Sequence, residues 1–302
     1  MTTSDPQPDV AVPPIAGLYW TLAGPVQFRT GREWSLFDFR DRCEEAARAG
    51  FSGIGLWHAD LEHILGRLTL AEMRQILDDN GVQCTELEFL TDWFLDAGDE
   101  RRKASDSRRR LLLDASVTLG AHHIKVGNLT GAPCPSGLLT EQFAALCAEA
   151  AQHTTAKIVY ELMPFDPNTN SLGKVLTVIE GADASNSGVA IDTWHMGKLA
   201  IPPGDMSRIP PRFLSWVELS DGQRASMPDL GEETLNHRRL PGEGELGVSQ
   251  YAAQCLAHGY TGPWGVEVLS EELRNLPMQE MYLRAYQATA AQFTVTGNGR
   301  DA

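Results

Sequence analysis

The sequence has few of the features that mark secreted, membrane-bound or metal-thiolate proteins. Its five cysteines, Cys43, Cys84, Cys134, Cys147 and Cys255, are scattered and include no CxxC pair. An odd, scattered set predicts neither a disulfide framework nor a thiolate zinc site, and it is typical of a reducing cytoplasm. No apolar run is long enough to span a bilayer, and no signal-peptide pattern opens the chain. We therefore expect a cytoplasmic protein with no membrane partner.

Basic residues and phosphate-binding glycine turns are also scarce. Lysine and arginine total 25 against 40 acidic residues, which gives a formal net charge of -15. The resulting field repels a phosphate backbone, so we expect no nucleic-acid partner. The segment 21–27, which follows the first apolar run, has no GxGxxG or GxxxxGK turn. This absence argues against a doubly wound nucleotide-binding sheet.

The 302 residues, 42% of them hydrophobic, are enough for one large core. We interpret residues 1–14, which are polar and proline-rich, as a disordered amino-terminal arm. Residues 15–295 are predicted to form a single domain. Residues 296–302 are predicted to be a flexible carboxy-terminal tail.

Short apolar segments alternate with amphipathic segments along this domain. Ser35 with Asp38 is predicted to open a helix that ends at Gly50, and Thr69 with Glu72 predicts a capping box. Further helices are predicted at 101–119, 140–153, 172–179, 247–258 and 278–293. The predicted strands are 15–22, 53–57, 82–90, 122–126, 157–161, 189–192, 213–219 and 263–268. Eight strands, each followed by a helix or helix-like segment, predict an α/β fold, a (β/α)8 TIM barrel.

Four acidic residues stand at the ends of predicted strands, namely Glu161, Asp192, Glu218 and Glu267. The active site of a parallel barrel lies at the carboxyl ends of its strands. Four carboxylates there would repel one another unless a divalent cation bound them, and oxygen ligands favour Mn²⁺ or Mg²⁺ over Zn²⁺. For any one acid alone, a helix cap or an ion pair with arginine is an equal alternative.

Five further residues are candidates for binding substrate. His195 lies three residues after Asp192, where its ring can reach a substrate hydroxyl. Arg238 and Arg239 precede a Pro-Gly turn that can place a guanidinium at the mouth, and the spacing favours Arg238. His58 follows the second strand. Lys125 on the fourth strand is either a substrate-binding residue or, more simply, an ion-pair partner for the acids.

Several segments together resemble the xylose isomerase-like TIM barrel superfamily, in particular its sugar phosphate isomerase/epimerase family. The resemblance runs from about Gly17 to Phe293. Its most specific segments are YELMPF at 160–165, IDTWH at 191–195, VELSD at 217–221, RRLPGEG at 238–244 and GPWGVE at 262–267. The resemblance implies that Glu161, Asp192, Glu267 and the position of Glu218 ligate one metal ion. It also implies that His195 and an arginine before the Pro-Gly turn contact substrate, and that a homodimer is common.

One position departs from the family pattern. The seventh strand of the family commonly supplies a histidine, and this chain has Glu218 there. A carboxylate adds negative charge, weakens the metal as a Lewis acid and favours harder ions. The identity of the metal therefore stays open, as does the alternative that water replaces Glu218.

The expected chemistry is proton removal beside a carbonyl group. Glu161 and Glu267 would act as base and acid on a small, sugar-like hydroxy-ketone, with the metal stabilising an enediolate. The first interpretation is a metal-dependent isomerase or epimerase of a ketose or keto-cyclitol in carbohydrate metabolism. The alternative is a dehydratase acting on an inosose or a dehydroshikimate-like substrate, and a further alternative is a non-catalytic sugar-binding barrel. These residues do not separate the three outcomes.

Overall fold

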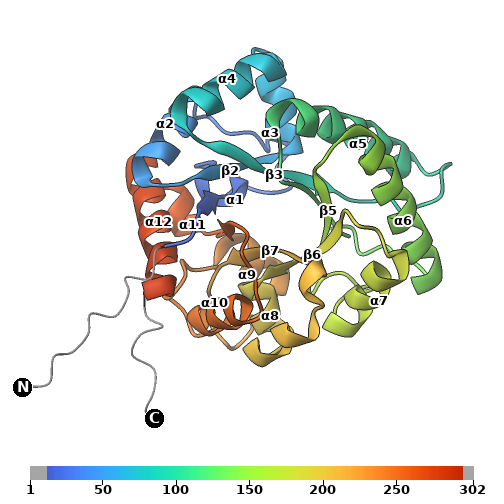
Figure 1. Cartoon of the computed structure of the whole chain (residues 1–302). Coiled ribbons are helices and arrows are strands. Elements are labelled where there is room, and N and C mark those ends of the chain that lie inside the picture. The colour runs from blue at the N-terminus through green and yellow to red at the C-terminus, as the bar shows by residue number, and fades with distance from the viewer. Residues whose placement is uncertain (1–11, 295–302) are drawn as a thin grey trace, which may run out of the picture.

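A computed structural model describes residues 12–294. The predicted tail at 296–302 lies outside the described residues, as do residues 1–11 of the predicted arm. Eight strands are hydrogen-bonded in sequence order, and β8 pairs with β1, so that the sheet closes into a parallel barrel. Figure 1 shows the strands in the middle of the molecule with the helices around them. The predicted TIM barrel is confirmed.

The strands follow the sequence prediction closely. They are β1 (Ile15–Gly17), β2 (Gly53–Trp57), β3 (Gln83–Leu90), β4 (His123–Val126), β5 (Lys157–Glu161), β6 (Ser187–Asp192), β7 (Leu214–Leu219) and β8 (Trp264–Val266). The α-helices are α1 (Tyr19–Leu22), α2 (Phe39–Ala49), α3 (His58–Leu65), α4 (Leu70–Asn80), α5 (Glu100–Leu119), α6 (Ser136–His153), α7 (Leu172–Ala182), α8 (Thr193–Lys198), α9 (Leu230–Asn236), α10 (Val248–Ala257), α11 (Glu271–Arg274) and α12 (Met278–Thr294). Two 3₁₀ helices, Pro203–Arg208 and Pro211–Phe213, precede β7.

Local capping explains why several of these helices begin and end where predicted. Thr69 and Glu72 form both bonds of a capping box at the start of α4. Gly50 ends α2 with a φ of 108°, a left-handed conformation that a residue without Cβ adopts at no steric cost. The predicted start of that helix at Ser35 is wrong, because Asp38 caps α2 instead and Leu36 is 62% exposed.

The first predicted strand, 15–22, is also too long. The chain is extended only over β1 and then turns into the short helix α1. Apart from Thr21, the residues of α1 are aromatic or aliphatic, and three of its four residues are buried. An apolar run of this length does not distinguish a strand from a buried helical turn.

Apolar packing fills the layer between the strands and the outer helices, whereas much of the barrel interior is polar. The largest apolar cluster joins strand residues such as Leu56 and Ile191 to helix residues such as Phe143. Inside the barrel, a small apolar cluster around Trp216 lies beside the buried side chains of Lys125 and Glu218. Within residues 12–294, no helix is both long and apolar enough to cross a membrane.

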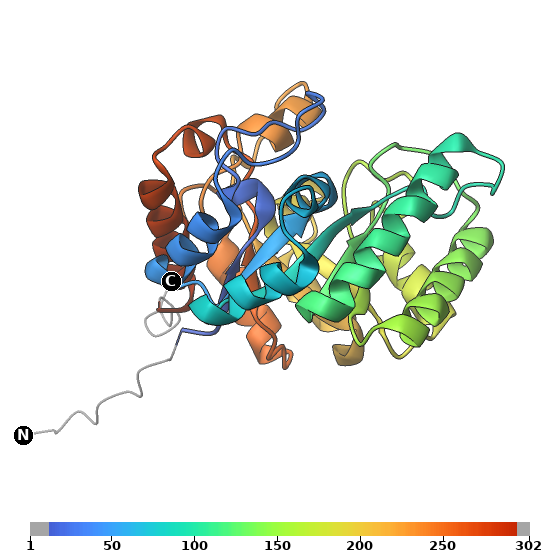
Figure 2. The ribbon, with the colours of Figure 1, turned by 90° about the horizontal axis from the view of Figure 1, so that it is seen from above.

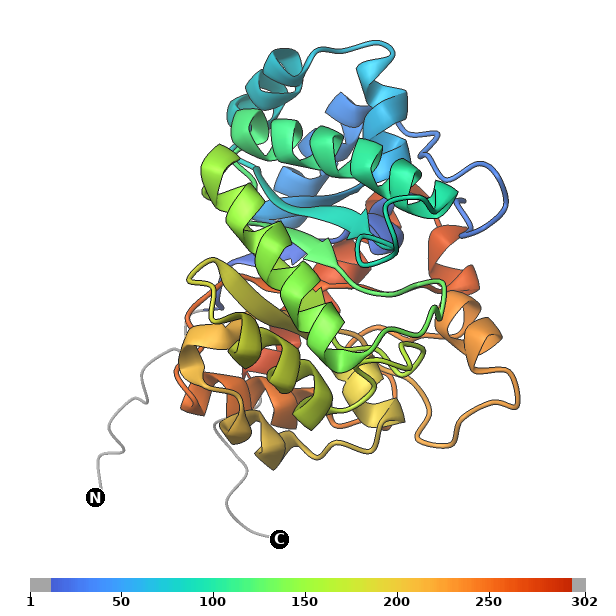
Figure 3. The same cartoon turned by 90° about the vertical axis from the view of Figure 1, so that its right-hand side faces the viewer.

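The loops that form the site project from one end of the barrel. Figures 2 and 3 both show the segment after α1 and the segment around α9 extending from the same end. Four of the eight strands carry an acidic residue at this end: Glu161 and Asp192 are the last residues of β5 and β6, Glu218 is the last but one of β7, and Glu267 follows β8. This end is the carboxyl-terminal face of the strands, where barrels of this kind carry their sites.

Candidate active site

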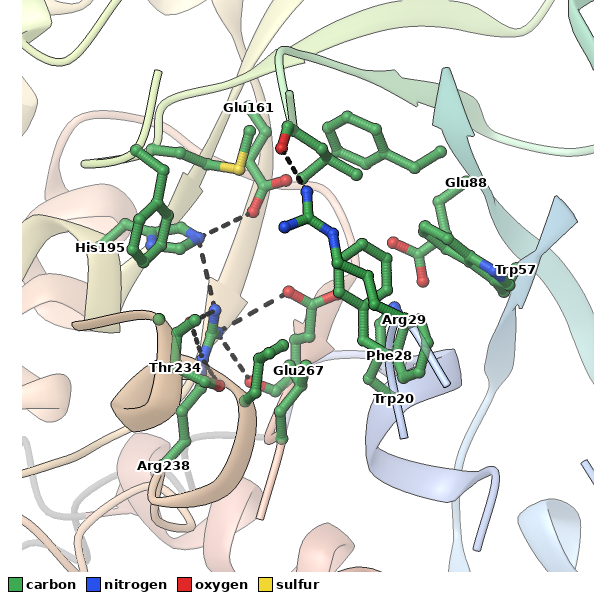
Figure 4. A pocket seen from close by; sticks show the side chains of 17 residues that line it. Trp20, Phe28, Arg29, Trp57, Glu88, Glu161, His195, Thr234, Arg238 and Glu267 are labelled. Atoms are coloured by element: carbon green, nitrogen blue, oxygen red, sulfur yellow. Dashed lines mark hydrogen bonds and ion pairs between the residues drawn. The ribbon is translucent and has the colours of Figure 1, made fainter. Parts of the chain in front are cut away.

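A cavity of about 200 Å³ opens at this end of the barrel. One wall is largely aromatic and includes Trp20, Phe28 and Trp57, whose rings meet edge to face with centroids 5.0–5.7 Å apart. The other wall is charged. Figure 4 shows five charged or titratable side chains directed into the cavity. They are Glu88 of β3, Glu161 of β5, His195 of α8, Arg238 after α9 and Glu267 after β8.

The four acids predicted at the strand ends do converge. Glu161 ends β5, Asp192 ends β6, Glu218 lies near the end of β7, and Glu267 follows β8. Each offers a carboxylate oxygen, and these four oxygens lie within 4.8 Å of one another. All four residues are buried. Burial of ionised carboxylates at this spacing requires cations, because the interior does not solvate their charge.

Lys125 supplies one of these cations. Its Nζ lies 2.9 Å from Oε1 of Glu218 and 2.9 Å from Oε1 of Glu267. It lies 3.1 Å from Glu88 and 3.4 Å from Glu86, both on β3. Lys125 is 1% exposed and does not line the cavity. The structure thus places it as an ion-pair partner beneath the site, and not on the cavity wall.

Arg238 is the second buried cation of the site. Its Nη1 donates to Oδ2 of Asp192 at 2.6 Å, and its Nη2 donates to Oγ1 of Thr234 at 2.8 Å. The guanidinium lies over the Trp194 ring, 4.7 Å from its centroid. Although burial opposes ionisation, Arg238 and His195 lower the pKa of Asp192. Arg238 therefore fixes an ionised carboxylate while it faces the cavity.

Three carboxylates around Lys125, those of Glu267, Glu218 and Glu86, have unequal proton affinities. Burial raises the pKa of Glu267 to about 7 and raises the pKa of Glu218 well above its ordinary value, although Lys125 opposes both shifts. Lys125 and His123 outweigh burial at Glu86 and lower its pKa to about 2. Without a further cation, the cluster thus retains protons at neutral pH. A divalent ion would displace them.

The donor set fits such an ion. Oε2 of Glu218 is buried and has no hydrogen-bond partner, which is an unfavourable state for a carboxylate oxygen. Lys125 and Arg238 bring two positive charges to a cluster of six buried carboxylates, which are Glu86, Glu88, Glu161, Asp192, Glu218 and Glu267. The acids outnumber these two cations, so a divalent ion would balance negative charge that remains when they ionise. The four residues fit a hard divalent metal with oxygen ligands.

His195 lies beside Glu161 on the cavity wall. Its Nε2 is 3.1 Å from Oε1 of Glu161 and 3.7 Å from Oδ2 of Asp192. Its Nδ1 is buried and has no hydrogen-bond partner. The Glu161–His195 pair can therefore hold or transfer a proton at the edge of the cavity.

Two more of the predicted substrate-binding residues, like Lys125, are not brought to the cavity. The backbone of Arg239 pairs with Asp221, and its exposed side chain donates to the carbonyl oxygen of Glu243. His58 is buried at the start of α3, where its Nδ1 lies 3.4 Å from the backbone nitrogen of Phe89. Burial lowers the pKa of His58 to about 3, so the ring is neutral. Neither side chain lines the cavity.

The segment that carries Arg238 is held by the carboxylate of Asp221. This carboxylate accepts hydrogen bonds from the backbone nitrogens of Gly222, Gly242 and Leu246. At Gly244 a Cβ would lie 2.4 Å from both Oδ1 of Asp221 and the carbonyl oxygen of Gly222, so a side chain does not fit there. The Pro-Gly segment is thus a compact turn that positions Arg238.

Sequence reasoning did not assign two residues of the cavity wall, Glu88 and Arg29, to the site. For Glu88 a signal was available: Glu86 and Glu88 are two positions apart on β3, so both side chains point into the barrel. Of the pair, Glu88 reaches the cavity. Arg29 also lines the cavity, and no strand end or motif in the sequence marks it.

Comparisons with known proteins place these features in a family. A family model described as "Xylose isomerase-like TIM barrel" matches residues 43–289. The chain is 26% identical over 241 residues to a 3-dehydroshikimate dehydratase of Pseudomonas putida, with 80% of this chain covered. It is 26% identical over 239 residues to a 3-dehydroshikimate dehydratase of Pseudomonas aeruginosa, with 78% of this chain covered. In both cases the match covers 37% of the relative, so the chain spans little more than a third of their length.

A solved structure has the same fold. The IOLI protein with a bound zinc atom superposes with a TM-score of 0.78 and 14% sequence identity, covering 93% of this chain and 98% of that protein.

Proposed function

The chain belongs to the xylose isomerase-like TIM barrel family, and on that premise we propose that it is a divalent-metal-dependent lyase. Its proposed reaction removes water from a small cyclic hydroxy-ketone of the 3-dehydroshikimate class. The observation that carries the proposal is the convergence of Glu161, Glu267 and His195 on one small cavity above a carboxylate cluster. The two Pseudomonas relatives support a dehydratase over the isomerase or epimerase that the sequence favoured.

Dehydration and epimerisation begin with the same step. In a substrate of this class, the carbon next to the carbonyl group, the Cα, carries a hydrogen and a hydroxyl group. The following carbon, the β carbon, carries a second hydroxyl. In the proposed reaction, Glu267 accepts the proton from this Cα, and the electron pair moves toward the carbonyl oxygen. Glu161, Asp192, Glu218 and Glu267 would hold a divalent cation, which would supply Lewis acidity to stabilise the negative charge that develops in this step.

The second step separates a lyase from an epimerase. As the electron pair returns to form a carbon–carbon double bond, the bond from the β carbon to its hydroxyl breaks. In the proposed reaction, the protonated Glu161–His195 pair, whose Oε1 and Nε2 lie 3.1 Å apart, gives its proton to that hydroxyl so that it leaves as water. For a dehydroshikimate, a proton then moves from the ring methylene carbon to the carbonyl oxygen, and this tautomerisation gives an aromatic dihydroxybenzoate. Overall, one dehydroshikimate gives one dihydroxybenzoate and one water, and the proton that Glu267 accepted replaces the one given to the leaving hydroxyl.

The shape of the cavity supports a small planar substrate. Its volume of about 200 Å³ is below the roughly 300–1,000 Å³ that is usual for drug-sized ligands. The rings of Trp20, Phe28 and Trp57 give it an apolar wall, whereas Glu161 and Glu267 make the facing wall polar. A flat ring with oxygen atoms along one edge matches both walls.

The direct test uses metal-depleted protein reconstituted separately with Mn²⁺, Mg²⁺ or Zn²⁺. Each sample is incubated with 3-dehydroshikimate, a ketose or an inosose. We expect an aromatic product from 3-dehydroshikimate, greatest with Mn²⁺ or Mg²⁺ because the proposed ligands are carboxylates, and none in EDTA. Epimerised ketose with no aromatic product would overturn the lyase in favour of an epimerase.

A further inference from the structure

Arg29 lies at the mouth of the cavity, on the loop between α1 and α2. Its Nη2 donates to the carbonyl oxygen of Leu129, which follows β4, at 2.8 Å. The side chain therefore spans the opening between two loops 100 residues apart in sequence. Figure 4 shows it extending from the aromatic wall across the cavity. Its guanidinium faces space that a bound substrate would occupy.

This guanidinium is a cation without an anionic partner among residues 12–294. The other arginine of the cavity wall, Arg238, is paired with Asp192. Arg29 forms no ion pair there, and apart from the bond to Leu129 its guanidinium N–H groups make no hydrogen bond with the described residues. A guanidinium presents several donors in one plane, which match a carboxylate.

The loop holds Arg29 in place without using its charge. Its backbone has a φ of 62°, and its backbone nitrogen donates to Oε1 of Glu33 at 2.6 Å. The other oxygen of Glu33 accepts a bond of 3.0 Å from Nε1 of Trp57. The guanidinium lies 5.1 Å from the centroid of the Phe28 ring. Glu33 thus fastens the loop to the aromatic wall and leaves the guanidinium directed at the cavity.

We propose that Arg29 binds the carboxylate of the substrate and so selects acidic cyclic hydroxy-ketones over neutral ketoses and inososes. The inference rests on the proposed function for the identity of the reacting end. Three other charged residues that line the cavity, Glu88, Glu161 and Glu267, would repel a carboxylate. The other lining cation, Arg238, is already paired with Asp192. Arg29 attracts it to the mouth, and the hydroxy-ketone edge of the same molecule then faces the acids.

The test separates binding of the carboxylate from turnover. Calorimetric titration of the metal-loaded protein uses two probes: 3,4-dihydroxybenzoate, which has a carboxylate, and catechol, which has none. The variants are Arg29→Gln and Arg29→Lys, with Arg32→Gln as the matched control. Arg32 is an exposed arginine of the same loop that donates to the carbonyl oxygen of Pro25 and does not line the cavity. The Michaelis constant for 3-dehydroshikimate is measured in parallel.

Removal of a charged hydrogen-bond partner is expected to weaken dihydroxybenzoate binding in Arg29→Gln by roughly 10- to 100-fold. Arg29→Lys should lose less, and catechol binding should not change. Equal effects on both probes, no effect on either, or a wild-type protein that does not prefer dihydroxybenzoate to catechol would overturn the inference. If the preference for the carboxylate depends on Arg29 but no aromatic product ever forms, the inference stands and the proposed lyase activity fails.

Discussion

The ammonium group of Lys125 on β4 lies 2.9 Å from Oε1 of Glu218 on β7, inside the barrel. The two strands are not neighbours in the sheet, so this contact crosses the barrel interior. Lys125 also contacts Glu267, Glu88 and Glu86. One fixed cation thus holds together the buried carboxylates beneath the cavity.

Replacement of this cation should destabilise the metal-depleted protein. Lys125→Met keeps much of the side-chain volume but leaves buried carboxylates unpaired, a change that usually costs about 3–5 kcal/mol. Urea denaturation measures the free energy of unfolding. Lys103→Met is the control, because Lys103 and Glu100 form an ion pair on the surface of α5 and such pairs contribute little. Equal stability of the two variants would show that Lys125 does not neutralise the cluster.

Glu218→His should shift the metal preference toward zinc or cobalt. Imidazole suits borderline ions, whereas the carboxylate of Glu218 suits harder ones. Competition titrations against a chelator give the affinity for each metal. Glu218→Gln controls for loss of charge alone, since it retains an oxygen ligand. If neither substitution changes metal affinity or selectivity, Glu218 is not a ligand and its unpaired Oε2 needs another explanation.

Metal affinity should rise as the pH increases through about 7. Burial raises the pKa of Glu267 to about 7 from an ordinary 4.5, so the folded, metal-free protein holds this proton at mildly acid pH. Metal must displace it, and binding therefore strengthens as the proton is lost. Isothermal titration at several pH values in buffers of different ionisation enthalpy measures both the affinity and the protons released. Affinity independent of pH in this range would contradict the shift.

The same pKa shift predicts the opposite trend in the stability of the metal-free protein. Because the folded state holds the proton of Glu267 more tightly than the unfolded state, its stabilising effect is fully present below pH 4.5. The effect is lost as the pH rises through about 7. Unfolding free energies across this interval should fall more steeply for the wild type than for Glu267→Gln. A steeper fall in the variant would reverse the sign.

Glu161→Gln and Glu267→Gln should each reduce turnover by at least about 10²–10⁴-fold, the usual contribution of a positioned acid or base. They should differ in proton exchange. Glu161→Gln retains the proposed base and should still exchange the substrate Cα proton with D₂O, whereas Glu267→Gln should not. Glu280→Gln, an exposed substitution on α12, is the control. Full metal content with near wild-type product formation in both site variants would refute the two-carboxylate mechanism.

The sequence was most informative where local chemistry determines structure. The Thr69–Glu72 capping box and the glycines that end helices depend on neighbouring residues, and they appear where predicted. The acids at the strand ends converge because parallel strands of a barrel end on one face.

The sequence was less informative where tertiary contacts decide. Arg238 and Arg239 are adjacent, and the backbone bridge between Asp221 and Arg239 directs one side chain inward and the other outward. Arg29 reaches the cavity only because the loops after α1 and β4 meet. No periodicity reports such a contact. The homodimer and the cytoplasmic location stay predictions.

The most direct measurement follows 3-dehydroshikimate by proton NMR in D₂O. The metal-depleted protein is first reconstituted with Mg²⁺ or Zn²⁺, because both ions are diamagnetic and leave the spectrum sharp. The account predicts that the signal of the Cα proton disappears while the aromatic signals of dihydroxybenzoate appear, and that Glu267→Gln produces neither change. A substrate that exchanges its Cα proton and yields a non-aromatic epimer or isomer would contradict the proposed dehydration.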